Sequence, residues 1–191
     1  PPAQAVLILI SHNPGSLLPT IRSRCRMLKF SELAEEEFNK IMADIAPEID
    51  LYDYDKWALL SGNSPGIALN LYKLSADKIY EELLEFFLGS NNISSLHSFA
   101  DRFSSKDNEK QWQMLKRLIL WLIARIASAS GGISHEVFKG EMAKINQLAT
   151  AKNLYFWTEL WEKAGNIFSE TDRLYLDKKQ AIITIIRSVT V

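Results

Sequence analysis

Basic side chains gather in the first 31 residues, and no acidic residue offsets them there. They are Arg22, Arg24, Arg26 and Lys29. A guanidinium keeps its charge at physiological pH and can contact phosphate oxygens through two parallel hydrogen bonds. A guanidinium of this cluster, such as that of Arg24 in the tripeptide Ser23-Arg24-Cys25, could therefore stabilise charge on a phosphoryl group. The same cluster could instead be a solvated face or a nonspecific contact to DNA.

Other residues that could carry chemistry are sparse. The single cysteine, Cys25, could in principle pair with His12 as thiol and imidazole, but no third orienting group is evident. The remaining histidines, His97 and His135, are far apart, and no Cys/His pair has metal-ligand spacing. The sequence has no glycine-rich phosphate loop. We therefore expect no metal site, no bound cofactor and no enzyme activity of the chain by itself.

A strand, a turn and a short helix are expected to position Arg24. Ala5–Ile10 is a continuous apolar run typical of a strand buried in a parallel sheet. It is followed by Asn13-Pro14-Gly15, a turn signal, and by Pro19, which favours the first turn of a helix. Polar groups beyond the carboxyl end of such a strand lie where ligands bind in open α/β sheets. No partner strand is evident, so we expect an α/β domain to precede this segment.

From residue 33 onward, every strong hydrophobic period is helical. Pro47 is expected to end the first of these helices, Gly62 the second and Gly89 the fourth, while Ser64 and Ser75 are expected to cap the third and fourth. The first three expected helices lie within about residues 33–73. The next two carry the apolar residues of 79–87 and 96–103, and the later ones cover about residues 108–129, 137–148, 154–168 and 181–189. This pattern predicts a packed helical bundle whose aromatic residues lie in its core.

Composition and charge exclude several classes of protein. The 191 residues are 47% hydrophobic and 24% charged, which is ordinary for a globular chain. The longest apolar run, residues 118–124, is far shorter than the ~20 residues of a membrane span. One cysteine favours a reducing, cytoplasmic location. Residues 32–63 hold nine acidic residues against two lysines, whereas the net charge of the chain is only −1, so a free-standing nucleic-acid-binding protein is disfavoured.

Three segments carry a resemblance to a known family. The ordered stretch Leu7–Arg26 resembles the sensor-1 strand and Ser-Arg-Cys motif of clamp-loader AAA+ ATPases. Leu60–Leu69 is similar to the start of that family's sensor-2 helix, where the ATP-hydrolysing subunits place an arginine. Here the matching position is Gly66, after Pro65. Leu174–Gln180 is similar to the start of the last collar helix.

The resemblance implies a mainly α fold in three parts. Residues 1–30 would be the C-terminal remnant of an AAA+ domain, 31–74 a three-helix lid and 75–191 a helical collar that mediates oligomerisation. The missing sensor-2 arginine favours a non-hydrolysing subunit. Arg24 would then be an arginine finger acting in trans, with Ser23 and Cys25 as its supporting motif, on ATP bound by a neighbouring subunit.

The resemblance also implies partners. These would be the other clamp-loader subunits, with the sliding clamp and primed DNA contacted through the assembled complex, and the chain would serve a DNA polymerase holoenzyme. Two alternatives stay open. One is a gamma/tau-type ATPase subunit with a diverged lid, and the other is a helical scaffold protein with a phosphate-contacting basic patch. A thiol enzyme that uses Cys25 is the least favoured reading.

Overall fold

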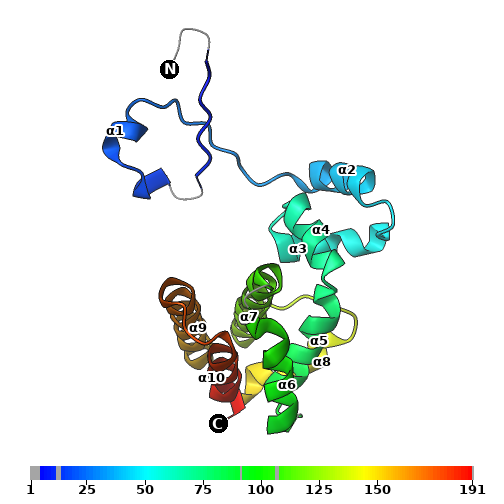
Figure 1. The fold of residues 1–191 in the computed structure, drawn as a ribbon. Helices are drawn as coiled ribbons and strands as arrows, with labels where there is room; N and C mark the ends of the chain where they lie inside the picture. Colours follow the sequence, from blue (N-terminus) through cyan, green and yellow to red (C-terminus); the bar gives the residue numbers. More distant parts are fainter. Residues whose placement is uncertain (1–4, 12–13, 91, 106–107, 191) are drawn as a thin grey trace. The chain divides into compact units, whose positions relative to one another are not determined.

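The computed structural model describes residues 5–11, 14–90, 92–105 and 108–190. The chain divides into two compact units, Pro1–Ser31 and Glu32–Val191, hereafter unit 1 and the helical unit. The described residues form ten α-helices and no strand, which confirms the expected mainly α fold (Figure 1). The expected boundary between a lid and a collar near residue 74 stays a prediction.

Unit 1 holds little regular structure. A 3₁₀ turn, η1 (Pro14–Ser16), precedes the short helix α1 (Pro19–Arg22), which begins at its proline as expected. The prediction of a buried strand at Ala5–Ile10 is wrong for this structure, because the described residues 5–11 have no regular secondary structure. The side chains of Val6–Ile10 are 51–88% exposed. The described residues form no sheet, and a strand forms only when its N–H and C=O groups find a partner in a neighbouring strand.

The helical unit begins with three short helices in mutual contact, α2 (Glu35–Ile45), α3 (Tyr54–Ser61) and α4 (Pro65–Lys73), with the 3₁₀ turn η2 (Leu51–Asp53) before α3. Gly62 ends α3 in the left-handed conformation, φ +63°, as its position predicted. Ser64 and Ser75 occupy the expected cap positions, but neither side chain makes a capping hydrogen bond. Instead, the Ser64 N–H donates to Ser61 Oγ at 3.2 Å.

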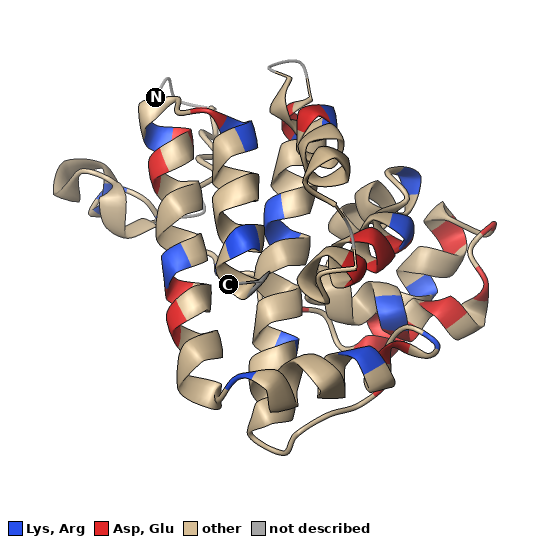
Figure 2. Ribbon diagram, turned by 90° about the horizontal axis from the view of Figure 1, so that it is seen from below, with Lys and Arg blue, Asp and Glu red and all other residues tan. Residues whose placement is uncertain are grey.

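Six further helices complete this unit. They are α5 (Ala76–Phe87), α6 (Ile93–Ser104), α7 (Glu109–Ser130), α8 (Glu141–Ala151), α9 (Leu154–Leu174) and α10 (Lys178–Thr190). Helix α7 contacts α5, α6, α8 and α9, and α10 packs against α5, α6 and α9. Lys, Arg, Asp and Glu are scattered over the helices of this unit (Figure 2).

The helical period predicted the helices better than it predicted burial. Ile41 and Ile45 on α2 are 38% and 44% exposed, although their spacing placed them on the apolar face. Trp161 on α9 is likewise about half exposed, and Phe30 in unit 1 is 94% exposed, so the expectation that every tryptophan and phenylalanine lies in the core is wrong for both.

A buried carboxylate fixes the segment before α8. Glu141 is only 3% exposed, and its Oε1 accepts hydrogen bonds from the Val137 and Phe138 N–H groups at 2.7 and 3.0 Å. The Arg125 guanidinium on α7 donates to the same oxygen at 2.6 Å, and the Tyr80 hydroxyl on α5 donates to Oε2 at 2.7 Å. Val137 and Phe138 precede the helix, which starts at residue 141 rather than 137 as expected, because Gly140 has a left-handed backbone with φ +79°.

Burial, together with the hydrogen bond to Glu141, raises the pKa of Tyr80 far above its ordinary value. Tyr80 therefore stays a neutral donor across the pH range in which proteins fold. Its ring stacks on Phe138 with ring centroids 4.4 Å apart. The three helices α5, α7 and α8 are thus joined by a single polar centre within an apolar surround.

We predict that Glu141→Gln destabilises the helical unit by about 3 kcal/mol, because it leaves the buried Arg125 guanidinium without its counter-charge. The measurement is the free energy of unfolding in urea, followed by circular dichroism. Glu162→Gln, on the exposed side of α9, is the matched control and should change that free energy by less than about 0.5 kcal/mol. Equal effects of the two substitutions would contradict a special role for Glu141.

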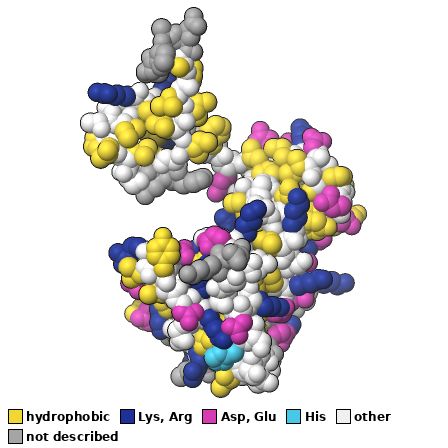
Figure 3. Space-filling model, viewed as in Figure 1, with side chains coloured by type: hydrophobic (Ala, Val, Ile, Leu, Met, Phe, Trp, Pro, Cys, Tyr) yellow, Lys and Arg dark blue, Asp and Glu magenta, His cyan; other side chains and the backbone are white. Residues whose placement is uncertain are grey.

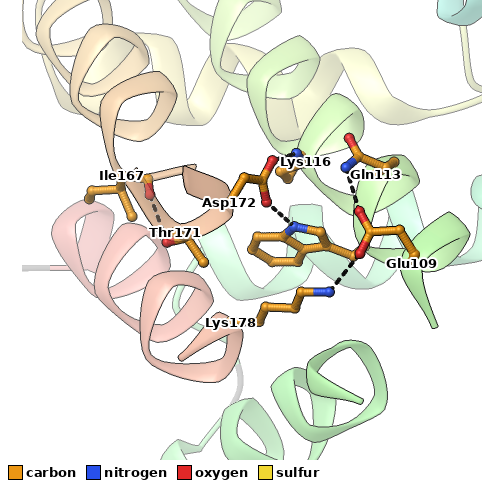
Figure 4. A network of polar contacts seen from close by, with 8 residues as sticks. Glu109, Gln113, Lys116, Ile167, Thr171, Asp172 and Lys178 are labelled. Carbon is orange, nitrogen blue, oxygen red and sulfur yellow. Dashed lines mark hydrogen bonds and ion pairs between the residues drawn. The ribbon is translucent and has the colours of Figure 1, made fainter. Parts of the chain in front are cut away.

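A second polar network joins α7 to α9 and α10 (Figure 4). The indole Nε1 of Trp112 donates to Asp172 Oδ1 at 2.7 Å, and Lys116 pairs with the other carboxylate oxygen. Nearby, Lys178 at the start of α10 donates to Glu109 Oε2 at 2.9 Å. Burial opposes ionisation of Asp172, but the hydrogen bonds from Lys116 and Trp112 outweigh it and lower its pKa.

This pKa shift has a consequence for acid stability. A carboxylate whose pKa is lower in the folded state than in the unfolded state stabilises the fold above the unfolded pKa, about 3.9 for aspartate. That contribution is lost as the pH falls from about 4 through the folded pKa. We predict that Asp172→Asn lowers stability at pH 7 and flattens its decline below pH 4.

The measurement is urea unfolding between pH 2.5 and 7, monitored by tryptophan fluorescence. Asp44→Asn is the control, because Asp44 on α2 is exposed and forms no ion pair within the described residues. If the free energy of unfolding of Asp172→Asn changed with pH in parallel with that of the unmodified chain, Asp172 would not contribute to the pH dependence of stability.

Candidate phosphate-contacting loop

The candidate loop, residues 22–29, begins at the last residue of α1. The Ser23 N–H donates to Pro19 O at 2.9 Å, and the Arg24 N–H donates to Ile21 O at 3.1 Å. The Cys25 N–H continues the turn with a 3.4 Å bond to Arg22 O. The backbone of the Ser-Arg-Cys motif is therefore wound onto the end of α1, and this local winding requires no contact from distant segments.

The side chains of Ser23, Arg24 and Cys25 are all exposed. The Ser23 hydroxyl donates to Thr20 O at 3.4 Å, so it bonds to the helix backbone in this structure. Cys25 is a free, exposed thiol. The roles of Ser23 and Cys25 in supporting Arg24 stay predictions.

No neighbouring acid neutralises the cationic side chains of this loop. Within the described part of unit 1, Arg22, Arg24, Arg26 and Lys29 are exposed and form no ion pair. The helical unit differs, since several of its lysines and arginines pair with carboxylates, as Lys56 does with Asp53 at 2.9 Å. The loop therefore presents its positive charge to whatever anion approaches it.

The other expected chemistry has little structural basis. His12 lies outside the described residues, so the structure does not test a pair between its imidazole and Cys25. His97 and His135 are exposed. The described residues contain no group of His, Cys, Asp and Glu side chains arranged to hold a metal ion.

Gly66, which the family resemblance aligns with the sensor-2 arginine, lies in the first turn of α4. Gly66 is exposed, and a Cβ atom added there would meet no atom within 4 Å. Steric exclusion therefore does not explain the absence of a longer side chain. The helix begins with Pro65 and offers no cation in its first turn.

Two features were not foreseen from the sequence. One is the Glu141 centre, because a carboxylate at the start of an amphipathic helix carries no sign that it is buried. The other is an open groove between α9 and α10 of about 750 Å³. Its lining is mostly polar or charged, with the apolar side chains of Phe156, Leu160 and Ile183 among them. The groove brings together residues about 25 positions apart, and only the packing of the two helices creates it.

The structure thus defines a mainly helical chain with an exposed arginine loop in its N-terminal unit. The family described as "DNA polymerase III, delta subunit" matches residues 1–34, the stretch that contains this loop. This match points to the DNA polymerase III clamp-loader family and to a role in DNA replication. No curated protein and no solved structure matches the chain. Among the described residues, no helix has the length and apolar character needed to cross a membrane.

The open space at Gly66 yields a prediction. Gly66→Arg should leave the free energy of unfolding unchanged or raise it by up to about 1 kcal/mol, because arginine favours a helix over glycine and meets no obstacle. Gly140→Arg is the matched control. An added Cβ meets open space there too, but φ is +79°, so we expect destabilisation of about 1–2 kcal/mol. Urea unfolding measures both, and a destabilised Gly66→Arg would contradict the open position.

Proposed function

We propose that the chain is the C-terminal part of the delta-prime subunit of bacterial DNA polymerase III, the non-hydrolysing stator of the clamp loader. In this proposal the chain is a cytoplasmic, non-catalytic member of the polymerase holoenzyme, itself a nucleotidyltransferase complex. Its collar helices assemble with the delta and gamma/tau subunits. The family match over residues 1–34 supports the clamp-loader part, and Gly66 at the sensor-2 position supports the non-hydrolysing part.

The observation that carries the proposal concerns the exposure and ion pairing of the Arg24 side chain. Its guanidinium is exposed and forms no ion pair within the described residues, and it lies in the segment that the family matches. We assign it as an arginine finger that reaches ATP held by a neighbouring subunit. There it donates hydrogen bonds to γ-phosphate oxygens and stabilises the charge that develops as the phosphoryl group transfers. ATP is bound by the neighbouring subunits, and this chain supplies no cofactor of its own.

The test uses the full-length protein that carries this chain, assembled with its motor subunits, the sliding clamp and primed DNA. Arg24→Ala should lower ATP hydrolysis at the site it faces by about 10³-fold or more. Arg26→Ala is the matched control, since it removes an equally exposed cation two residues away. Gel filtration of both assemblies shows whether the ring survives, and we expect it to survive.

The alternatives predict other outcomes. A basic patch that contacts DNA predicts similar losses for the Arg22, Arg24 and Arg26 variants, with a steep dependence on salt. A gamma/tau-type subunit predicts that the protein hydrolyses ATP without a neighbour. Unchanged hydrolysis in an intact Arg24→Ala ring would refute the arginine finger. Failure of the unmodified protein to join the ring would refute the family assignment.

A further inference from the structure

The helix α2 carries an apolar stripe that the core does not cover. Ile41 and Ile45 are four residues apart, so they lie one turn apart on the same side of the helix. They are 38% and 44% exposed, whereas Phe38 and Met42, on the adjoining side, are fully buried. The apolar surface of α2 is therefore wider than the core requires.

The chain beyond α2 also carries exposed apolar side chains. In η2, Leu51 and Tyr52 are 69% and 93% exposed, and Leu59 on α3 is about half exposed. Hydrophobic side chains gather over the part of the chain that holds α2–α4, with acidic side chains at the margin (Figure 3). A surface of this kind, apolar and rimmed by charge, is typical of a site that another protein covers.

Two acidic residues lie beside the stripe, and Lys40 is their neighbour on α2, three residues after Glu37 and four before Asp44. Glu37 and Asp44 lie four residues before and three residues after Ile41, on the same side of α2. Residues 32–63 hold nine acidic residues and only two lysines. Lys56 is mostly buried and pairs with Asp53, so Lys40 is the one further cation in the stretch. Asp44 and Glu48 form no ion pair within the described residues.

We propose that the α2 face, defined by Glu37, Ile41, Asp44 and Ile45, binds a basic amphipathic segment of another protein. The apolar side of such a segment would cover the two isoleucines, and its lysines or arginines would lie beside the two carboxylates. The same carboxylates repel nucleic acid and acidic proteins, which gives the face its specificity. This proposal does not depend on the function proposed above.

The probe is a fluorescein-labelled 18-residue peptide with Leu at helical spacing and Lys at its other positions, titrated with the whole chain by fluorescence anisotropy. The double variant Ile41→Ser/Ile45→Ser should weaken binding by about 10-fold or more, as expected for truncation of central apolar contacts. Ile93→Ser is the control. Ile93 is 67% exposed on α6, away from the acidic stretch, so its substitution should change the affinity less than 2-fold.

The charge variant keeps the test valid if the serine variants unfold, because it leaves the apolar side chains in place. Glu37→Gln/Asp44→Asn should weaken binding and make it less sensitive to salt between 50 and 300 mM NaCl. Glutamine at 37 can still accept the 3.3 Å bond from the Ala34 N–H. Glu162→Gln/Glu170→Gln on α9 removes the same amount of charge elsewhere and should leave the affinity unchanged.

Three outcomes would overturn the proposal. Equal losses of peptide affinity in the α2 and α9 charge variants would mean that binding depends only on the net charge of the chain. Undiminished binding by both the serine and the charge variants would place the peptide elsewhere. Concentration-dependent association of the unmodified chain in sedimentation, abolished by Ile41→Ser/Ile45→Ser, would identify a second copy of the chain as the occupant.

Discussion

The helical unit depends on the burial of the apolar side of α7 against its neighbouring helices. Its residues Leu118, Ile119, Leu122 and Ile123 are completely buried, whereas Ala124 and Ser128 are exposed, so other helices must cover one broad side of it. Burial of such side chains contributes roughly 1.5–3 kcal/mol each relative to exposure. The sequence must therefore supply neighbours on every apolar side, and α5, α6, α8 and α9 are those neighbours.

The cations of α7 then fix how the neighbours dock. A guanidinium drawn into an apolar surround must find acceptors, since a buried charge without them is strongly destabilising. Arg117 donates to the Leu60 carbonyl at the end of α3 at 2.9 Å, and burial lowers its pKa. Arg125 donates to Glu141 at the start of α8. Each arginine thus ties a second helix to the central one at a defined position.

The sequence predicted the helices well because their spans are set by local information. The 3.6-residue period and residues such as Gly62 act over a few positions, and most of the expected spans agree with the structure to within a few residues. Burial is a property of the whole chain, so Ile41 and Trp161 could not be placed. The Glu141 centre joins residues 61 positions apart, and no local pattern signals it. The strand predicted at Ala5–Ile10 was wrong for the same reason, because a strand forms only beside a partner strand.

Arg24 stays a predicted site residue, and its exposure could not be predicted from the sequence. The order of strand-like segment, turn, proline-started helix and Ser-Arg-Cys carries the family resemblance, and that resemblance is what singles out Arg24 among the neighbouring arginines. The structure adds the contrast with Arg125. The Arg125 guanidinium is largely buried, bonded to the Glu141 carboxylate 2.6 Å away and stacked 4.8 Å from the Trp121 ring centre. These contacts stabilise the fold. Arg24 has no such contact within the described residues. An anion that reaches Arg24 displaces only water, whereas one that reached Arg125 would have to break a buried ion pair. Of these two arginines, only Arg24 can serve a phosphate without cost to the fold.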